Sequence, residues 1–125
     1  MRIFVLYHDP AQLDTVPDSH GLQKGLVGVV HAFAARPLSG ANNMVIAHEL
    51  LHTAGASDKY DLATGVPLVP IGLGDRDQVP LYPQQRTEIM AGRRALSPSE
   101  GDVPRSLREV VVGPETALEI RWSKP

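Results

Sequence analysis

The chain has no cysteine among its 125 residues. This absence excludes a disulfide framework and any metal site built on thiolates, and it fits a reducing compartment. Lysine and arginine form no basic stripe, and the net charge of −2 argues against a nucleic-acid-binding protein. No apolar run approaches the roughly 20 residues of a membrane-spanning helix. The first apolar run stops at Asp9 and Pro10, before it reaches the length of a signal-peptide core.

Internal repeats and low-complexity tracts are also missing from the sequence. The length suits one domain with one modest hydrophobic core. We expect residues 1–125 to form that domain, either as a minimal version of its fold or as the C-terminal part of a larger protein. The chain as given has the features of a cytoplasmic protein, and export stays open if a longer parent carries an upstream signal. The oligomeric state is not readable from the sequence.

The most informative segment, residues 48–58, reads H-E-x-x-H-x-x-G-x-x-D. On a helix, His48 and His52 lie four residues apart and therefore project from the same face. Neutral imidazole nitrogen is a preferred ligand of Zn²⁺, and three protein ligands leave one position open to water. Zinc lowers the pKa of such a water to about 7. Glu49 borders the same cavity and is predicted to take the proton from the water and to pass it to a leaving amine.

The residues around the two histidines favour a helix that is buried on most sides. Apolar residues, Leu50 among them, cover much of its surface, and Asn42 or Asn43 is expected to cap its start. Gly55 is expected to end it, because glycine tolerates a positive φ. A turn at this glycine sends the chain back towards the histidines. Asp58 is therefore the predicted third metal ligand.

This extended motif resembles that of the metzincin clan of zinc peptidases. Most metzincins have a third histidine where this chain has Asp58, and the aspartate is similar to that of the snapalysin-like branch. Residues 88–92, with the sequence Glu-Ile-Met-Ala-Gly, resemble the Met-turn of the same clan. The resemblance implies that Met90 forms a hydrophobic floor beneath the metal and is not itself a ligand.

Other ligand sets stay open from the sequence. Gluzincins, another group of zinc peptidases, take a glutamate from a later helix as the third ligand, and Glu88 is the candidate for that role. Asp61 is a further candidate, although its position suits a turn or a carboxylate that orients a ligating histidine. The last alternative is a site with no third protein ligand.

The rest of the sequence predicts an α+β fold. The expected elements are, in chain order, a strand at 3–7, a loop or short irregular helix at 9–21, a strand at 26–34, the zinc helix, a long ordered loop at 59–86, a helical stretch around 105–112 and a helix at 114–121 that begins with Pro114. Long ordered loops are uncommon unless they are functional. The loop at 59–86 is therefore expected to help build the site.

The resemblance implies a minimal metzincin-like fold, with a small sheet, an active-site helix and C-terminal helices. In metzincins an edge strand beside the cleft pairs with the substrate, and residues 26–32 occupy the matching place in chain order. The alternative is that these residues form a plain interior strand. His31 is expected either to line the cleft or to be structural.

The resulting hypothesis is zinc-dependent hydrolysis of peptide bonds in a peptide or protein substrate. Some metzincins stabilise the oxyanion with a tyrosine two residues after the Met-turn methionine, but here that position is Gly92. Tyr60 and Tyr82 are the nearest substitutes. Two alternatives remain, a zinc-stabilised binding or regulatory domain without turnover and a zinc hydrolase of a non-peptide amide. The intact Glu49 favours an enzyme, because a structural zinc site needs no base.

Overall fold

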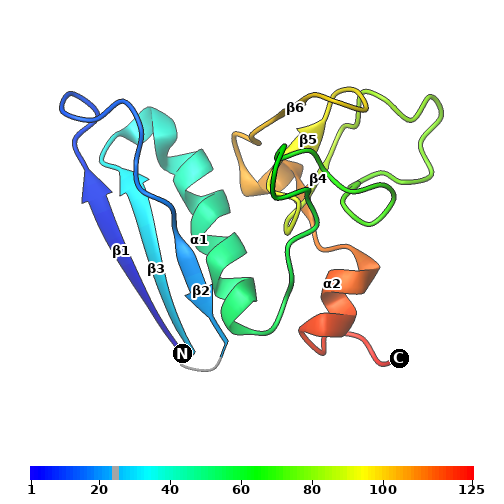
Figure 1. Ribbon diagram of the computed structural model, residues 1–125, viewed down its shortest axis with the longest axis horizontal. Coiled ribbons are helices and arrows are strands. Elements are labelled where there is room, and N and C mark those ends of the chain that lie inside the picture. The colour runs from blue at the N-terminus through cyan, green and yellow to red at the C-terminus, as the bar shows by residue number, and fades with distance from the viewer. Residues whose placement is uncertain (24–25) are drawn as a thin grey trace.

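The N-terminal part of the protein forms a three-stranded sheet (Figure 1). The computed structural model, which describes residues 1–23 and 26–125, contains β1 at Arg2–His8, β2 at His20–Leu22 and β3 at Val27–Phe33. The order is β1-β3-β2, with β1 parallel and β2 antiparallel to β3. The strands expected at 3–7 and 26–34 are thus confirmed.

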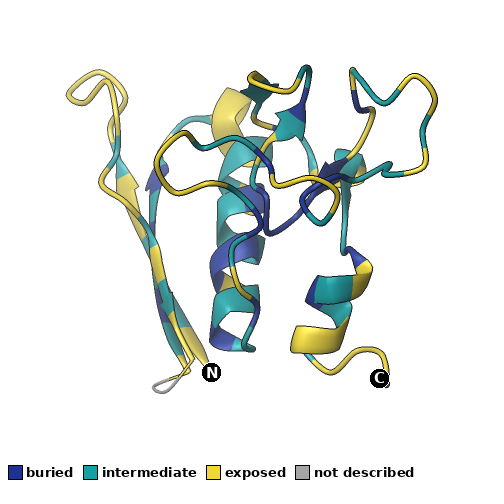
Figure 2. Cartoon of the chain, turned by 45° about the vertical axis from the view of Figure 1, so that its right-hand side comes forward, coloured by how far each residue is buried: buried dark blue, intermediate teal, exposed yellow. Residues whose placement is uncertain are grey.

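Alternating burial gives the sheet two different faces. Along β3, every second residue is buried, namely Gly28, Val30 and Ala32. This face packs against α1, the helix at Ser39–Thr53. The opposite face is more open, and the side chain of Phe4 on β1 is 52% exposed there. The sheet is therefore covered by a helix on one side only (Figure 2).

The position of β3 decides between the two interpretations of residues 26–32: they form the interior strand and not the edge strand beside the cleft. β3 lies at the centre of the sheet, with β1 on one side and β2 on the other. The edge nearest the cleft belongs to β2, which lies in the segment expected as a loop. Three residues are too few to show an alternating pattern, so this strand depends on its pairing with β3.

α1 begins earlier than expected, after the short 3₁₀ turn η1 at Arg36–Leu38. Its N-cap residue is Leu38, so the prediction of a cap at Asn42 or Asn43 is wrong. Asn42 instead lies within the helix and binds the end of β3. Its amide donates to the carbonyl oxygen of Phe33 at 2.8 Å and accepts the N–H of Phe33 at 3.2 Å. The side chain thus fastens the helix to the sheet.

α1 lies between the sheet and the C-terminal half of the protein (Figure 1). The buried side chains of the helix are those of Met44, His48, Glu49 and Thr53. Leu50 is 38% exposed, so the helix is less completely buried than its sequence suggests. On the side of the C-terminal half, the core joins Met44 to three residues from later segments, Ala56, Ile89 and Met90.

Residues 59–86 form a long ordered loop, as expected. They contain no named helix or strand, and isolated bridges join Tyr60 to Pro67 and Leu73 to Thr87. Gln84 is 2% exposed and forms hydrogen bonds with both backbone groups of Asp75. Hydrogen bonds of the Gln84 side-chain amide therefore stabilise this loop in the absence of regular secondary structure.

The remaining elements are short. They are β4 at Thr87–Glu88, β5 at Arg94–Ala95, β6 at Gly101–Asp102, the 3₁₀ turn η2 at Leu107–Glu109, β7 at Val110–Val111 and α2 at Pro114–Glu119. β4 pairs with β7 and β5 with β6. The helical stretch expected around 105–112 is only the turn η2, because the chain extends at Val110 to pair with β4. α2 begins at Pro114 as predicted and is the one α-helix in the described part of this region.

The protein is thus a small α+β structure with small sheets and one main helix. Among the described residues, no helix combines the length and the apolar character that crossing a bilayer requires.

Candidate metal centre

Three predicted ligand residues converge at the C-terminal half of α1. His48 and His52 project from the same side of the helix, and their ring centroids are 4.7 Å apart. One carboxylate oxygen, Oδ1 of Asp58, lies 3.1 Å from Nε2 of His48 and 2.9 Å from Nε2 of His52. A single point between these atoms is therefore within reach of two imidazoles and a carboxylate.

The other ring nitrogens fix the orientation of both histidines. Nδ1 of His48 lies 2.9 Å from the carbonyl oxygen of Ile89, and Nδ1 of His52 lies 2.8 Å from that of Ala56. A carbonyl oxygen only accepts hydrogen bonds, so each Nδ1 must carry the proton. In the neutral imidazole, each Nε2 is then left as a free lone pair.

These two lone pairs face Oδ1 of Asp58, which can also only accept a hydrogen bond. Ionised Asp58 offers no hydrogen, so neutral imidazoles beside it bring like partial charges together unless a cation lies between them. Protons on Nε2 meet this need by making imidazolium ions, and a divalent metal ion meets it while leaving both rings neutral. Two imidazoles and one carboxylate form a ligand set typical of Zn²⁺. The donor set therefore fits zinc.

The turn after α1 delivers Asp58, as the sequence predicts. Gly55 has a φ of +106°, a conformation that other residues rarely adopt. Its N–H donates to the carbonyl oxygen of His52 at 3.0 Å, and the N–H of Ala56 donates to that of Leu51 at 3.0 Å. These bonds close the helix end and reverse the chain, which returns Asp58 to the histidines.

Glu49 lies next to this triad. One carboxylate oxygen of Glu49 and one ring nitrogen of each histidine all fall within 4.8 Å of one another. Both histidines contact Asp58 at hydrogen-bond distance, so Asp58 is better placed than Glu49 to complete a set of three ligands. Glu49 is 6% exposed, and its Oε2 is buried without a hydrogen-bond partner among the described residues. An unpaired buried carboxylate oxygen is costly, so this oxygen is left available to a partner that enters the site.

The surroundings shift the pKa values of these groups in the metal-free protein. Burial by itself lowers the pKa of His48, but the hydrogen bonds to Asp58 and to the Ile89 carbonyl outweigh it and raise that pKa. Burial alone raises the pKa of Asp58, and its contacts with the two histidines lower it overall. Burial raises the pKa of Glu49 despite the opposing charges of the histidines.

The predicted turn at residues 88–92 lies directly beside the site. The N–H of Ala91 donates to the carbonyl oxygen of Glu88 at 3.0 Å, which closes a tight turn with Met90 fully buried in it. The turn holds His48 through the Ile89 carbonyl, and its Met90 carbonyl accepts the N–H of Lys59 at 2.8 Å. One turn thus fixes both the helix and the segment that carries Asp58.

Glu88 does not serve as a metal ligand in this arrangement. It is fully buried, and its Oε2 accepts the N–H groups of Met90 and Ala91. Its Oε1 accepts the N–H of Gly113 and the hydroxyl of Thr116. The carboxylate therefore joins the turn to the start of α2, a role that nothing in the local sequence indicates.

Asp61 is also not part of the cluster formed by the two histidines and Asp58. Its Oδ1 accepts the N–H groups of Ala63 and Thr64 at 2.9 Å each, so it caps a surface turn. The turn ends at Gly65, which has a φ of +72°. This is the turn-forming role that the sequence offers for Asp61.

The site opens into a cleft of about 1090 Å³. Its lining includes the end of the 9–21 segment, β2, Gly65 and residues 91–93. Tyr60 and His31 both line this cleft, and His31 also forms a hydrogen bond with His8 at 2.9 Å. Burial and the charges of Asp58 and Glu49 raise the pKa of Tyr60.

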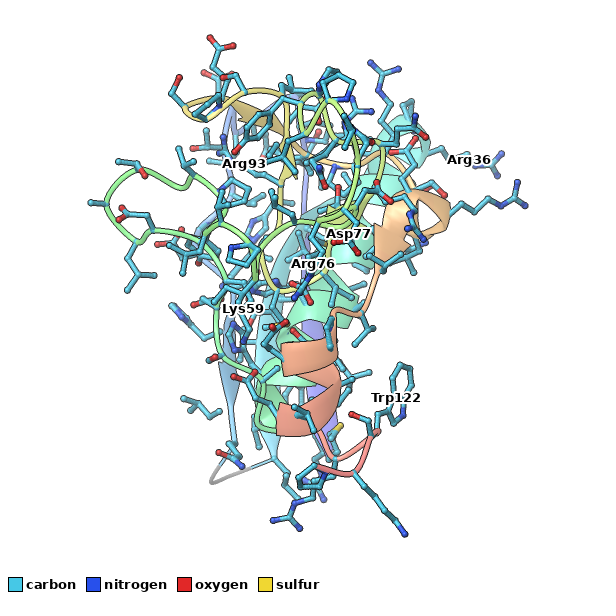
Figure 3. All side chains as sticks on the ribbon, turned by 90° about the vertical axis from the view of Figure 1, so that its right-hand side faces the viewer. Arg36, Lys59, Arg76, Asp77, Arg93 and Trp122 are labelled. Atoms are coloured by element: carbon cyan, nitrogen blue, oxygen red, sulfur yellow. The ribbon has the colours of Figure 1, made fainter. Side chains whose placement is uncertain are left out.

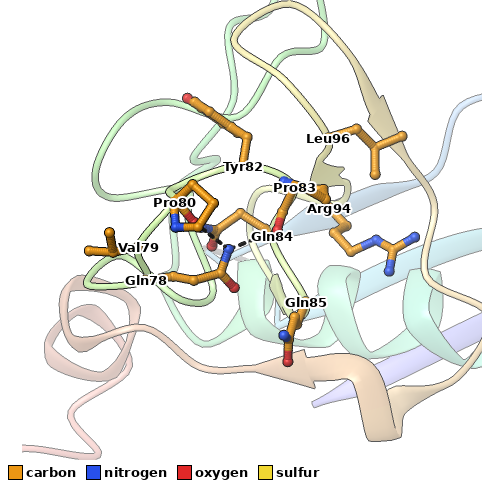
Figure 4. A pocket seen from close by; sticks show the side chains of 9 residues that line it. All are labelled: Gln78, Val79, Pro80, Tyr82, Pro83, Gln84, Gln85, Arg94 and Leu96. Carbon is orange, nitrogen blue, oxygen red and sulfur yellow. Dashed lines mark hydrogen bonds between the residues drawn. The ribbon is translucent and has the colours of Figure 1, made fainter.

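A second hollow of about 470 Å³ lies within the long loop (Figure 4). Tyr82 lines this hollow and not the cleft. Gln78 supports its rim, because its amide donates to the carbonyl oxygens of Pro80, Leu81 and Pro83. The hollow contains none of the predicted ligands, so Tyr60 is the better placed of the two candidate tyrosines.

Close packing of β2 against α1 is a feature that the sequence does not indicate. A Cβ atom on Gly21 would lie 2.5 Å from the carbonyl oxygen of Glu49 and 2.6 Å from Cβ of His52. Glycine is therefore needed at this position of the cleft wall. A three-residue strand offers no local pattern from which this contact follows.

The sequence also does not predict the ion pair between Lys59, the residue after Asp58, and Glu119. The ammonium of Lys59 is almost completely buried and lies 2.7 Å from Oε2 of Glu119 on α2. Glu119 further accepts the N–H and the hydroxyl of Ser57. Figure 3 shows Lys59 beside α2, near Arg76, which pairs with Glu115 of the same helix. α2 thus binds the residues on both sides of Asp58, Ser57 and Lys59, through Glu119.

Comparisons of the chain with models of known protein families, with curated proteins and with solved structures gave no match. Its function must therefore be inferred from the site itself.

Proposed function

We propose that the chain is a zinc-dependent peptidase of the metzincin type. The observation that carries the proposal is the arrangement of His48, His52 and Asp58, in which both Nδ1 atoms donate to carbonyl oxygens and both Nε2 atoms face one carboxylate oxygen. Hydrogen bonds from Nδ1 to a carbonyl oxygen are the contacts that orient ligating histidines in metal sites. These three residues would hold the zinc.

Bound zinc supplies a Lewis acid, which polarises a carbonyl group and lowers the pKa of water. Glu49 supplies the proton transfers. Burial raises the pKa of Glu49 above its ordinary value, which makes the carboxylate a stronger base. Its unpartnered Oε2 accepts a proton from the attacking water and returns it to the leaving amine.

Tyr60 is the proposed donor to the substrate carbonyl oxygen. It lines the cleft, and its hydroxyl carries a proton at neutral pH, as an ordinary tyrosine does; burial raises its pKa further. A hydroxyl that is held in place stabilises negative charge as it develops on that oxygen. Tyr60, which lies close to Asp58 in the chain, is proposed for this donor role because Gly92 has no side chain.

The substrate is proposed to bind along β2 in extended form. β2 is an edge of the sheet and forms part of the cleft wall. Backbone pairing at a sheet edge gives affinity with little dependence on side chains. Gly21 brings this edge close to Glu49, so a paired peptide lies near the proton-transferring group.

The metzincin assignment draws on the order of these parts along the chain. A sheet precedes the helix with two histidines, a glycine turn leads to Asp58, and a tight turn with buried Met90 lies under the helix. The small number of strands makes this a minimal version of such a fold.

The decisive test compares Glu49→Gln with the wild type. The variant is expected to bind one zinc per chain, measured by elemental analysis, because Glu49 is not a ligand. Its turnover of a mixed peptide substrate should fall by roughly 10²- to 10⁴-fold, the range for loss of a general base. Glu100→Gln, in an exposed loop, is the matched control and should keep its activity.

Other outcomes select the alternatives. Turnover that survives Glu49→Gln contradicts the proposed mechanism. A wild-type protein that binds zinc and gains stability, but cleaves neither peptides nor simple amides, is a zinc-stabilised binding domain. Cleavage of simple amides without cleavage of peptides indicates a non-peptide amide hydrolase.

A further inference from the structure

Arg93 follows the turn that contains Met90 and lines the same cleft as β2. Its side chain is exposed. Among the described cleft residues it is the one lysine or arginine, whereas three carboxylates, Asp18, Glu49 and Asp58, line the same cleft. Arg93 therefore provides the permanent positive charge of this part of the cleft.

The neighbouring arginine shows how differently the two side chains are used. Arg94 forms two hydrogen bonds to Asp102, at 2.9 and 2.6 Å, and so ties β5 to β6. Arg93 takes part in none of the ion pairs within the described residues. Its guanidinium is thus available for a ligand.

The Arg93 side chain lies beside one glycine, Gly65, and follows another, Gly92. A Cβ atom on Gly65 would lie 4.0 Å from Nε of Arg93, so the guanidinium passes beside the turn that Asp61 caps. A Cβ atom on Gly92 would meet no described atom within 4 Å. The Arg93 side chain therefore lies against the turn that ends at Gly65, and open space adjoins the backbone at Gly92.

We propose that Arg93 forms a subsite for a carboxylate group of the peptide substrate. A guanidinium presents several N–H donors in one plane, which match the two oxygens of a carboxylate. The carboxylate is either that of an acidic side chain or the C-terminal carboxylate of the peptide. The inference rests on the proposed function for its substrate, since it names the chemical class of peptide that the cleft selects.

Binding to Glu49→Gln, loaded with zinc, tests the subsite without turnover. The probes are fluorescent alanine-based peptides of three kinds: one series with a single glutamate moved along the chain, the same series with glutamine, and a neutral peptide with either a free or an amidated C-terminus. Fluorescence anisotropy measures the affinity of each. The series is repeated on the metal-free protein, so that carboxylate binding by the ion is separated from binding by Arg93.

We expect one carboxylate-bearing probe to bind about three- to tenfold more tightly than its neutral partner. Arg93→Gln should abolish the difference, and added salt should reduce it. Arg36→Ala is the control, because Arg36 is exposed in η1 and lies away from Arg93 (Figure 3). Preference for internal glutamate identifies an acidic side chain, and preference for the free terminus identifies the C-terminal carboxylate.

The inference is wrong if no carboxylate probe binds at millimolar concentration, if neutral and acidic probes bind equally, or if Arg93→Gln keeps the preference. Thermal unfolding of each variant checks that it is folded. Arg93→Glu repeats the test with a second substitution and should lower the affinity for acidic probes further. Failure of the proposed hydrolysis is a separate result. If the wild-type protein cleaves no peptide but shows Arg93-dependent binding, the proposed subsite is correct and the proposed peptidase activity is wrong.

Discussion

At the scale of single residues, Asp58 couples the metal site to protons. In the metal-free protein its carboxylate holds imidazolium at His48, which raises the pKa of His48 above the ordinary 6.5 and lowers that of Asp58 below the ordinary 3.8. The first shift stabilises the fold fully below pH 6.5 and is lost as the pH rises through the raised pKa. The second stabilises it above pH 3.8 and is lost as the pH falls through the lowered pKa.

Zinc competes with those protons, and this gives a prediction about pH. Binding requires neutral Nε2 atoms, so the affinity for zinc should rise as His48 loses its proton. The gain in Tm on adding zinc is therefore expected to grow as the pH is raised from about 6 to about 8. Thermal unfolding with zinc or with chelator measures it. Asp58→Asn should weaken the dependence, and a gain in Tm that is constant with pH would contradict the ligand assignment.

At the scale of secondary-structure elements, α2 is expected to hold the third ligand in place. Glu119→Gln removes the charge that pairs with buried Lys59, so the segment carrying Asp58 should become less well positioned. Loss of such outer partners lowers metal affinity by roughly 10- to 100-fold. Competition with a chromogenic chelator measures the affinity.

Glu115→Gln is the matched control for this experiment. It lies on the same helix, and its side chain pairs with Arg76 on the long loop. Zinc affinity should change little in this variant even if its stability falls. Equal loss of affinity in both variants would mean that α2 acts only through overall stability.

The contact between β2 and α1 gives a second prediction for the elements. Gly21→Ala places a methyl group against the backbone of Glu49 and the side chain of His52, and neither the helix backbone nor a ligating side chain yields easily. We expect a loss of about 1–3 kcal/mol in the free energy of unfolding. Chemical denaturation measures it, and Leu22→Ala, at a 63% exposed position of the same strand, should be nearly neutral.

Features that depend on neighbouring residues were predictable from the sequence. The helix, its end at Gly55 and the return of Asp58 follow from spacings within residues 48–58, and the strands β1 and β3 follow from their composition. The N-cap of α1 was mispredicted, because Asn42 binds β3 instead of the helix start.

Features that depend on distant residues were not predictable. Glu88 binds Gly113, which is 25 residues away, and Glu119 binds Ser57, which is 62 residues away. β2 depends on pairing with β3 and on the fit of Gly21 against α1. A single sequence carries no local pattern for such contacts, since tertiary packing decides them.

At the scale of the whole molecule, the site joins two halves of the protein. α1 packs on the sheet, whereas Asp58 and Met90 belong to the C-terminal half. A ligand set that spans both halves should make zinc a structural link between them. Zinc at about 1,000 times its dissociation constant adds roughly 4 kcal/mol to the free energy of unfolding.

Hydrogen exchange can locate this effect. Removal of zinc is expected to speed exchange of the Lys59 amide, whose bond to the Met90 carbonyl lies next to Asp58, more than that of amides within β3. Exchange measured by mass spectrometry, with and without chelator, checks this. Uniform acceleration along the chain would instead indicate global destabilisation.

The shared oxygen of Asp58 also bears on the charge balance of the pocket. A divalent ion, two neutral imidazoles and the two carboxylates of Asp58 and Glu49 sum to zero net charge. With a histidine in place of Asp58, the same pocket would keep one excess positive charge, which would favour ionised Glu49 and hold its pKa down. With zinc bound as proposed, an aspartate ligand would thus make the resting site electrically neutral, so that it would need no counter-ion from solvent.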